Sequence, residues 1–137
     1  MKDLDEITFS FVDVEIPATK RTPYVKLNKA EGIIELRGKS FPENANSTYW
    51  SLNRWIAEYL AYPAKTTNIT IALSFMNNTT SRLITEMLKN MHSTVGIKSN
   101  LIVNWYYEQG DTEMESIGQY YNELLKGLIV LHEVDKI

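Results

Sequence analysis

The stretch 69-ITIALSFMNNTTSRLITEMLKNM-91 decides the fold that we predict for this chain. Its first part, Ile69–Met76, is short, mostly apolar and rich in β-branched residues, which is typical of a parallel-sheet strand buried on both faces. From Leu83 to Met91 apolar residues recur at helical spacing, so a helix follows directly. Five small polar residues, 77–81, separate the two elements. Because a turn needs only one or two special residues, we treat this segment as a candidate site.

The segments on either side extend the same alternation of elements. Before this stretch, the patterns predict a strand over 7–14 and a hairpin of two strands, 24–28 and 33–39, that closes at Gly32. A helix follows the cap candidates Asn44, Asn46 and Ser47 and ends by Pro63. After the stretch, the patterns predict a strand over 101–107, a helix over 111–126 that ends at Gly127, and a strand over 128–131. The order β-β-β-α-β-α-β-α-β predicts a single α/β domain over residues 1–137. Its mixed sheet is antiparallel at the N-terminal hairpin and parallel afterwards, with helices packed on it.

Composition excludes several function classes. The chain of 137 residues has no cysteine, which rules out disulfides, thiolate metal sites and a cysteine nucleophile. The formal net charge of -3 argues against nucleic acid as a partner, because such surfaces are basic. The N-terminus lacks the pattern of a signal peptide, and no apolar run reaches the ~20 residues of a membrane span. We therefore expect a cytoplasmic protein without membrane insertion.

No pattern in the sequence indicates a catalytic residue, a metal site or a cofactor. His92 and His132 have no partner at ligand spacing, and there is no phosphate-binding glycine loop or nucleophile elbow. The acids from Glu108 to Glu115 precede and open a helix, where each stabilises the positive helix end by about 0.3–1 kcal/mol. The alternative is that these acids hold Mg²⁺ in a small hydrolase or transferase, since ligands of open α/β sheets bind at the carboxyl ends of strands.

Aromatic residues in the strand over 101–107 are candidates for a partner surface. Trp105 and Tyr107 share one face of this strand and Tyr106 lies on the other, because side chains alternate along a strand. Core packing accounts for most of them, but one or two exposed aromatic side chains would serve as anchors for a protein partner. With the acids Asp111 and Glu113 they form the partner surface that we predict.

The polar turn offers either a helix cap or an anion site. Thr79 and Thr80 are followed three residues later by Arg82 and Leu83, so neither starts a capping box. The first helical turn contains no acid, which leaves its N–H groups and positive dipole end for an anion. A phosphate on Thr79 or Thr80 would add roughly -1.5 to -2 charges where negative charge is favoured. A simple cap remains the commoner use of such residues.

Four stretches resemble the SiaC-type family of bacterial regulatory phosphoproteins, which is linked to biofilm control. They are 18-ATKRTPYVKL-27, 32-GIIELRGKSFPEN-44, 75-FMNNTTSR-82 and 103-VNWYYEQGDTEMESIGQYYNELL-125. The resemblance implies a STAS-like fold and a non-enzymatic partner switch. In it the unphosphorylated protein activates a membrane-associated diguanylate cyclase. A protein kinase phosphorylates a threonine at the start of the helix after the central strand, and a PP2C-type phosphatase removes the phosphate.

The chain departs from the family pattern at the phosphorylation site. The pattern there reads Asn-Thr-Ser-Ser, and an ungapped match places Asn77 and Asn78 on its first two residues. A shift by one residue makes Thr79 the acceptor, with Thr80 second and with Asn77, Asn78, Ser81 and Arg82 completing the switch turn. Without that shift the acceptor is lost, Asn78 caps the helix, and the chain is a constitutive interaction module.

Overall fold

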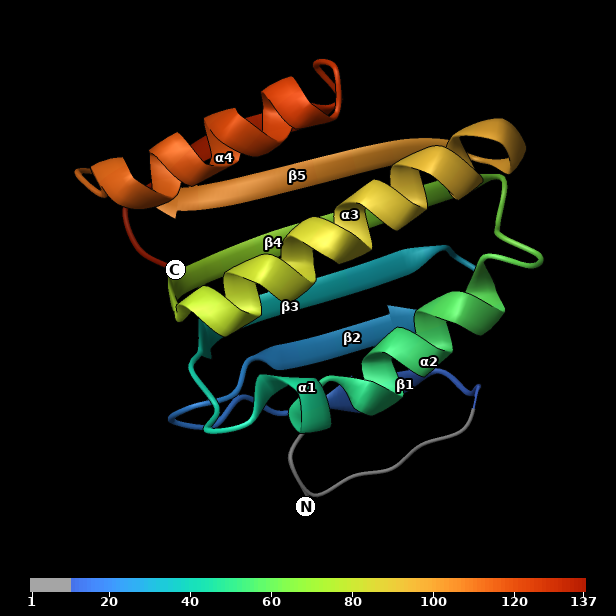
Figure 1. The fold of residues 1–137 in the computed structure, drawn as a ribbon, viewed down its shortest axis with the longest axis horizontal. Helices are drawn as coiled ribbons and strands as arrows, with labels where there is room; N and C mark the ends of the chain where they lie inside the picture. The colour runs from blue at the N-terminus through green and yellow to red at the C-terminus, as the bar shows by residue number, and fades with distance from the viewer. Residues whose placement is uncertain (1–10) are drawn as a thin grey trace.

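The structure, a computed structural model, describes residues 11–137 apart from the side chains of 94–98. In this part of the chain six strands form one sheet that helices accompany (Figure 1). The strands are β1 (Val14–Ile16), β2 (Tyr24–Asn28), β3 (Ile33–Ser40), β4 (Thr66–Met76), β5 (Asn100–Glu108) and β6 (Ile129–Val134). The helices are α1 (Ala45–Thr48), α2 (Trp50–Tyr59), α3 (Asn78–Lys98) and α4 (Thr112–Leu124).

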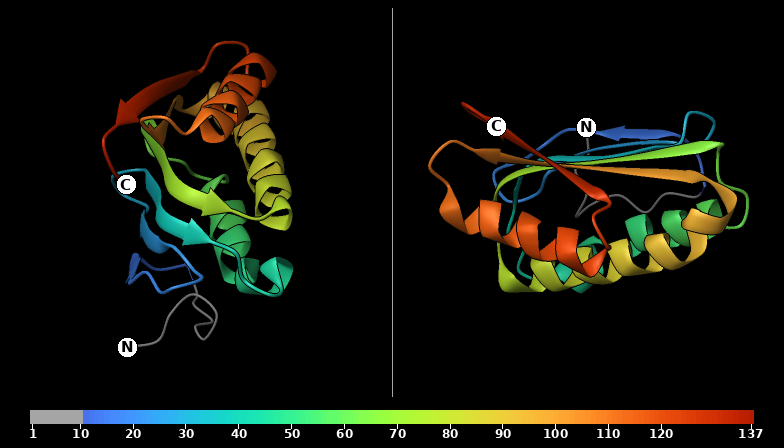
Figure 2. Two further views of the ribbon diagram at one scale, coloured as in Figure 1. Left: turned by 90° about the vertical axis from the view of Figure 1, so that its left-hand side faces the viewer. Right: turned by 90° about the horizontal axis from the view of Figure 1, so that it is seen from above.

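The strands lie in the sheet in the same order as in the sequence, β1-β2-β3-β4-β5-β6. β1, β2 and β3 pair antiparallel, and β3 to β6 pair parallel, which confirms the predicted mixed sheet. β4 is an interior strand between β3 and β5, also as predicted. Right-handed crossovers that always step in the same direction place every helix on the same side of the sheet. Figure 2 shows this arrangement.

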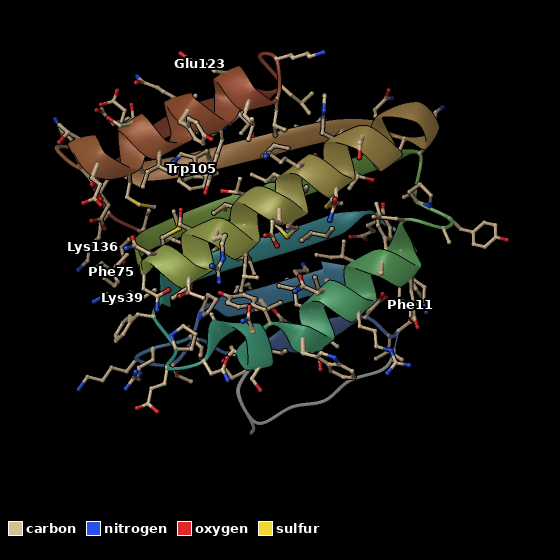
Figure 3. The ribbon with its side chains drawn as sticks, viewed as in Figure 1. Phe11, Lys39, Phe75, Trp105, Glu123 and Lys136 are labelled. Atoms are coloured by element: carbon tan, nitrogen blue, oxygen red, sulfur yellow. The ribbon has the colours of Figure 1, made fainter. Side chains whose placement is uncertain are left out.

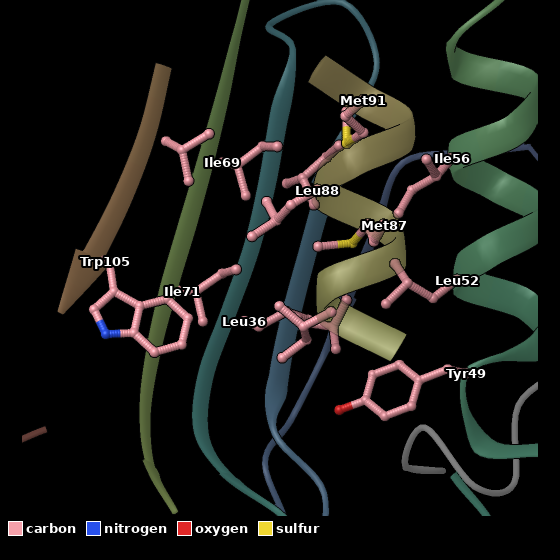
Figure 4. Close-up of a cluster of buried hydrophobic side chains, with 14 of the residues drawn as sticks. Leu36, Tyr49, Leu52, Ile56, Ile69, Ile71, Met87, Leu88, Met91 and Trp105 are labelled. Atoms are coloured by element: carbon pink, nitrogen blue, oxygen red, sulfur yellow. The ribbon is translucent and has the colours of Figure 1, made fainter. Parts of the chain in front are cut away.

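The expectation that β4 is buried on both faces therefore holds only in part. Ile69, Ile71 and Leu73 point to the helices and are fully buried. On the opposite face Ala72 is also buried, whereas Asn68 and Thr70 are only half-buried. The apolar run predicted a strand that is covered on both faces, but whether helices cover both faces depends on the order of the strands in the sheet. The core lies between the helix-side face of the sheet and side chains such as Met87 and Leu88 of α3 (Figure 4).

A bulge ends the regular alternation in β4. Gly38 pairs with Leu73 but the next residue, Lys39, pairs with Phe75, so Ser74 is the extra residue. The bulge turns Phe75 away from the core and leaves 51% of it exposed. It is placed at the carboxyl end of the strand, where a bulge re-aims the last side chains before the turn.

Several local predictions are confirmed with shifted boundaries. Gly32 closes the hairpin with φ +68°, and a Cβ there would lie 2.2 Å from the Thr66 carbonyl oxygen, so only glycine fits. The first predicted helix is divided into α1 and α2. The Asn44 side chain caps α1 by accepting from the Ser47 N–H, and α2 ends before Pro63. Of the predicted first strand, residues 11–13 precede β1 and residues 7–10 lie outside the described part.

Candidate functional site: the start of helix α3

Asn77 connects β4 to α3 and caps the helix. Its Oδ1 accepts a hydrogen bond of 2.9 Å from the Thr80 N–H, and its Nδ2 donates to the Pro42 carbonyl oxygen over 3.3 Å. Asn78 is thus the first helical residue and is exposed, so the expectation that Asn78 caps the helix is corrected to Asn77. Both asparagines have the right chemistry, but only Asn77 lies against the Pro42 carbonyl.

Thr80 belongs to a buried chain of hydroxyl groups. Its side chain is 0% exposed, and Oγ1 lies 3.0 Å from Ser40 Oγ, which in turn lies 2.5 Å from the Tyr49 hydroxyl. These bonds join the end of β3, the start of α2 and the first turn of α3. A kinase would have to open this packing to reach Thr80.

Thr79 is the accessible threonine of the turn. It is half-buried, and within the described residues its hydroxyl has no hydrogen-bond partner. The first turn of α3 contains no acid, and Arg82 is exposed next to it, as the sequence predicts. The positive end of the helix dipole is therefore uncompensated by charge at Thr79.

Ser81 connects the turn to α4 through Tyr121. The Tyr121 hydroxyl donates to the Ser81 carbonyl oxygen over 3.0 Å and accepts from Thr85 Oγ1 over 2.9 Å. Sequence reasoning did not connect Tyr121 or Ser40 to the turn, because each contacts it across 40 positions of the chain, and Tyr49 reaches the turn only through Ser40. A hydroxyl at apolar helical spacing, as at Tyr121, was the one available signal.

The acids after β5 have structural partners. Asp111 Oδ1 caps α4 by accepting from the Met114 N–H over 3.1 Å, which confirms its helix-end role. Glu115 accepts from the Tyr107 hydroxyl over 3.3 Å, and Glu108 accepts from the Ile137 N–H over 2.9 Å. Among the described residues no three His, Cys, Asp or Glu side chains are placed to hold a metal ion.

The predicted partner surface is divided between core and exterior. Trp105 is fully buried between β5 and α4 (Figure 3), where its Nε1 donates to the Met114 carbonyl oxygen over 2.9 Å. It is thus corrected from surface anchor to core residue, because α4 covers this part of β5. Tyr107 and Asp111 are half-buried and Glu113 is exposed. Partial burial raises the pKa of the Tyr107 hydroxyl, and the carboxylates of Glu115 and Glu133 raise it further.

Removing the Asn77 cap should lower the stability of the protein measurably. We expect Asn77→Ala to lower the free energy of unfolding by about 1 kcal/mol, because the Thr80 N–H loses its partner. Chemical denaturation of the purified protein measures this change. Asn78→Ala is the matched control and should change stability by less than about 0.5 kcal/mol, as exposed positions do. Equal losses in the two variants would contradict the assignment of Asn77 as the cap.

A family model, a protein relative and solved structures all match this chain. The model of the SiaC family of regulatory phosphoproteins matches residues 16–134. An uncharacterized protein of Pseudomonas aeruginosa is 19% identical over 111 residues, which cover 81% of this chain and 88% of that protein. The structure of SiaC of P. aeruginosa is similar with a TM-score of 0.80 and 18% identity, covering 90% of this chain and 99% of the other.

A second solved structure is a complex. It contains the diguanylate cyclase SiaD with its activator SiaC from P. aeruginosa. The matched chain there gives a TM-score of 0.81 at 17% identity, over 89% of this chain and 100% of the other. At this identity the likeness shows the fold. Among the described residues no helix is long and apolar enough to cross a membrane.

Proposed function

Because the chain belongs to the SiaC family of regulatory phosphoproteins, we propose that it is a non-enzymatic, cytoplasmic partner-switch adaptor. In its unphosphorylated form it binds and activates a diguanylate cyclase. A protein kinase and a PP2C-type phosphatase set the fraction that is phosphorylated. The family match over residues 16–134 is the observation that carries this proposal, and the solved SiaC–SiaD complex supplies the class of partner. The STAS-like nature of the fold stays a prediction.

We propose Thr79 as the phosphate acceptor. Thr79, at the second position of α3, has a hydroxyl without a hydrogen-bond partner among the described residues, whereas Thr80 is buried and bonded to Ser40. A phosphate on Thr79 would lie at the positive end of a helix whose first turn has no acid, and Arg82 is one turn away. Phosphorylation there adds charge to the surface without breaking the core. Asn78 occupies the first helical position, so a kinase that phosphorylates only this position would find no hydroxyl there.

The phosphorylation test uses point variants in the native host. Thr79→Ala should be unphosphorylated by mass spectrometry and still bind the cyclase. Thr79→Asp should keep the melting temperature, because an acid in the first turn stabilises a helix by about 0.3–1 kcal/mol, and should bind the cyclase at least about tenfold more weakly. Pull-down of the cyclase and assay of cyclic di-GMP measure the effect.

Two control variants separate the remaining interpretations. Thr80→Ser keeps the buried hydroxyl and should be phosphorylated on Thr79 as in the wild type. Asn78→Thr restores a hydroxyl at the first helical position. If Asn78→Thr alone becomes phosphorylated, the chain is a constitutive module and the Thr79 assignment is wrong. If Thr79→Ala is phosphorylated as well as the wild type, another residue is the acceptor.

A further inference from the structure

A cavity of about 530 Å³ lies at the carboxyl ends of β3, β4 and β5. Each of these strands contributes a side chain near its end, Lys39, Phe75 and Glu108 in turn, and the chain after β6 adds Lys136 and Ile137. Figure 3 shows Lys39, Phe75 and Lys136 together at this end of the sheet. Small-molecule sites commonly have volumes of about 300–1,000 Å³, so the cavity has room for a small ligand.

The cavity belongs to the face of the sheet that no described helix covers. In the register of β3 and β4, Lys39 pairs with Phe75 and Ser40 pairs with Met76. Ser40 is buried on the helix side, so Lys39 and Phe75 point to the other side, because side chains alternate along a strand. The bulge in β4 is what brings Phe75 to this face. Thr79 belongs to α3, which packs on the opposite face (Figure 2).

Phe75 gives the cavity an exposed aromatic wall. Its ring packs against the ring of Phe41, with 5.5 Å between the centroids and 79° between the planes. This contact between two aromatic rings holds the Phe75 ring in a defined orientation although half of the side chain is exposed. A planar ring of a ligand can therefore stack on Phe75.

Two lysines without partners line the same cavity. Among the described residues, the side chains of Lys39 and Lys136 form neither an ion pair nor a hydrogen bond. The acid that lines the cavity, Glu108, accepts a hydrogen bond of 2.9 Å from the Ile137 N–H. The lining side chains thus carry two positive charges and one negative charge, in a chain whose net charge is -3. This local excess of positive charge favours an anionic ligand.

We propose that this cavity binds a nucleotide, whose base stacks on Phe75 and whose phosphates contact the ammonium groups of Lys39 and Lys136. A nucleotide uses both features of the cavity, because its base is planar and its phosphates are anions that lysine binds. An inorganic anion would leave the aromatic wall unused, and an acidic peptide segment has no need of a ring on which to stack. The inference goes beyond the proposed function and does not depend on it, since neither Thr79 nor the cyclase enters it.

Calorimetric titration of the full chain with GTP tests the site, on a protein without a tag after Ile137 because this residue lines the cavity. Lys39→Gln and Lys136→Gln should each weaken GTP binding about tenfold, as the loss of a hydrogen bond to a charged group does. Guanosine, which has no phosphate, should bind at least about tenfold more weakly than GTP. Tripolyphosphate, which has no base, should bind at least about fivefold more weakly.

Phe75→Leu separates stacking from packing, because leucine keeps an apolar side chain but has no ring. This variant should keep the melting temperature and the affinity for tripolyphosphate, and should bind GTP about fivefold more weakly. Lys26→Gln is the matched charge control, since Lys26 lies on the same face of the sheet, in β2, outside the cavity. Tyr62→Ala, at a tyrosine that is 92% exposed, is the aromatic control. Both controls should bind GTP as the wild type does.

Four outcomes would overturn the proposal. The first is that the wild-type protein does not bind GTP at millimolar concentration. The second is equal affinity for GTP and tripolyphosphate, which would make the cavity a site for anions in general. The third is an equal loss of GTP binding in Lys26→Gln and Lys39→Gln, which would mean that the charge of the whole face attracts the nucleotide. The fourth is competition by an aspartate-rich peptide as strong as that by unlabelled GTP. These measurements omit the cyclase, so a failure here leaves the proposed function standing.

Discussion

Replacing Leu73 by aspartate should abolish the folded state. Leu73 is 0% exposed and lies in the interior strand β4, on the side that faces the helices. A carboxylate there has no partner, and burying such a group costs several kcal/mol, comparable with a domain stability of ~5–15 kcal/mol. Circular dichroism should show no cooperative thermal transition in the Leu73→Asp variant.

A control on the same strand isolates the effect of burial. Asn68 is half-buried in β4 and points to the face that no helix covers. Asn68→Asp introduces the same charge and should retain a cooperative melt close to that of the wild type. A cooperative and unshifted transition in Leu73→Asp would show that its burial is assigned incorrectly.

Gly118→Val should cause the second large loss of stability. A Cβ at Gly118 would lie 2.4 Å from Cδ1 of the Trp105 ring, closer than atoms can approach. Trp105 is fully buried and bonded to the Met114 carbonyl, so the ring has no room to move. Overpacking a core of this kind costs typically about 1–3 kcal/mol, and we expect a loss of about 3 kcal/mol in urea denaturation.

The neighbouring position supplies the control for helix propensity. Gln119 is exposed in the same helix, so Gln119→Val carries the cost of a β-branched residue without the collision. It should lower stability by less than about 0.7 kcal/mol, within the range of intrinsic helix propensities. A Gly118→Val variant as stable as Gln119→Val would mean that α4 and β5 are farther apart than in the structure.

Local sequence patterns predict the helices and strands, but they do not predict which faces of the strands the helices cover. The change from β-branched residues over 69–76 to helical spacing over 83–91 identifies β4 and α3, because backbone geometry fixes both periods. Which faces of β4 are covered depends on the order of strands in the sheet. The Ser74 bulge also depends on pairing with β3, and no local signal marks it.

The polar turn between β4 and α3 was located from sequence, but the contacts of its residues were not. Two asparagines and two threonines have nearly the same local chemistry. Contacts distant in sequence distinguish them, since Pro42 selects Asn77 as the cap and Ser40 buries Thr80. In the same way, alternation placed Trp105 and Tyr107 on one face, but the packing of α4 on β5 decides that Trp105 lies in the core.

The sequential order of the strands bears on how the chain assembles during synthesis. The β1–β2–β3 sheet is complete once the first third of the protein has emerged, because it needs only local antiparallel pairing. Each later strand adds to the edge left by its predecessor, and no strand has to be inserted between two others. Synthesis from the N-terminus, at about 5–20 residues per second, therefore produces each strand when the sheet edge with which it pairs is already present. The contacts of the turn at the start of α3 with Pro42 and Ser40 can form once β4 has joined β3, whereas the bond from Tyr121 to Ser81 has to wait for α4.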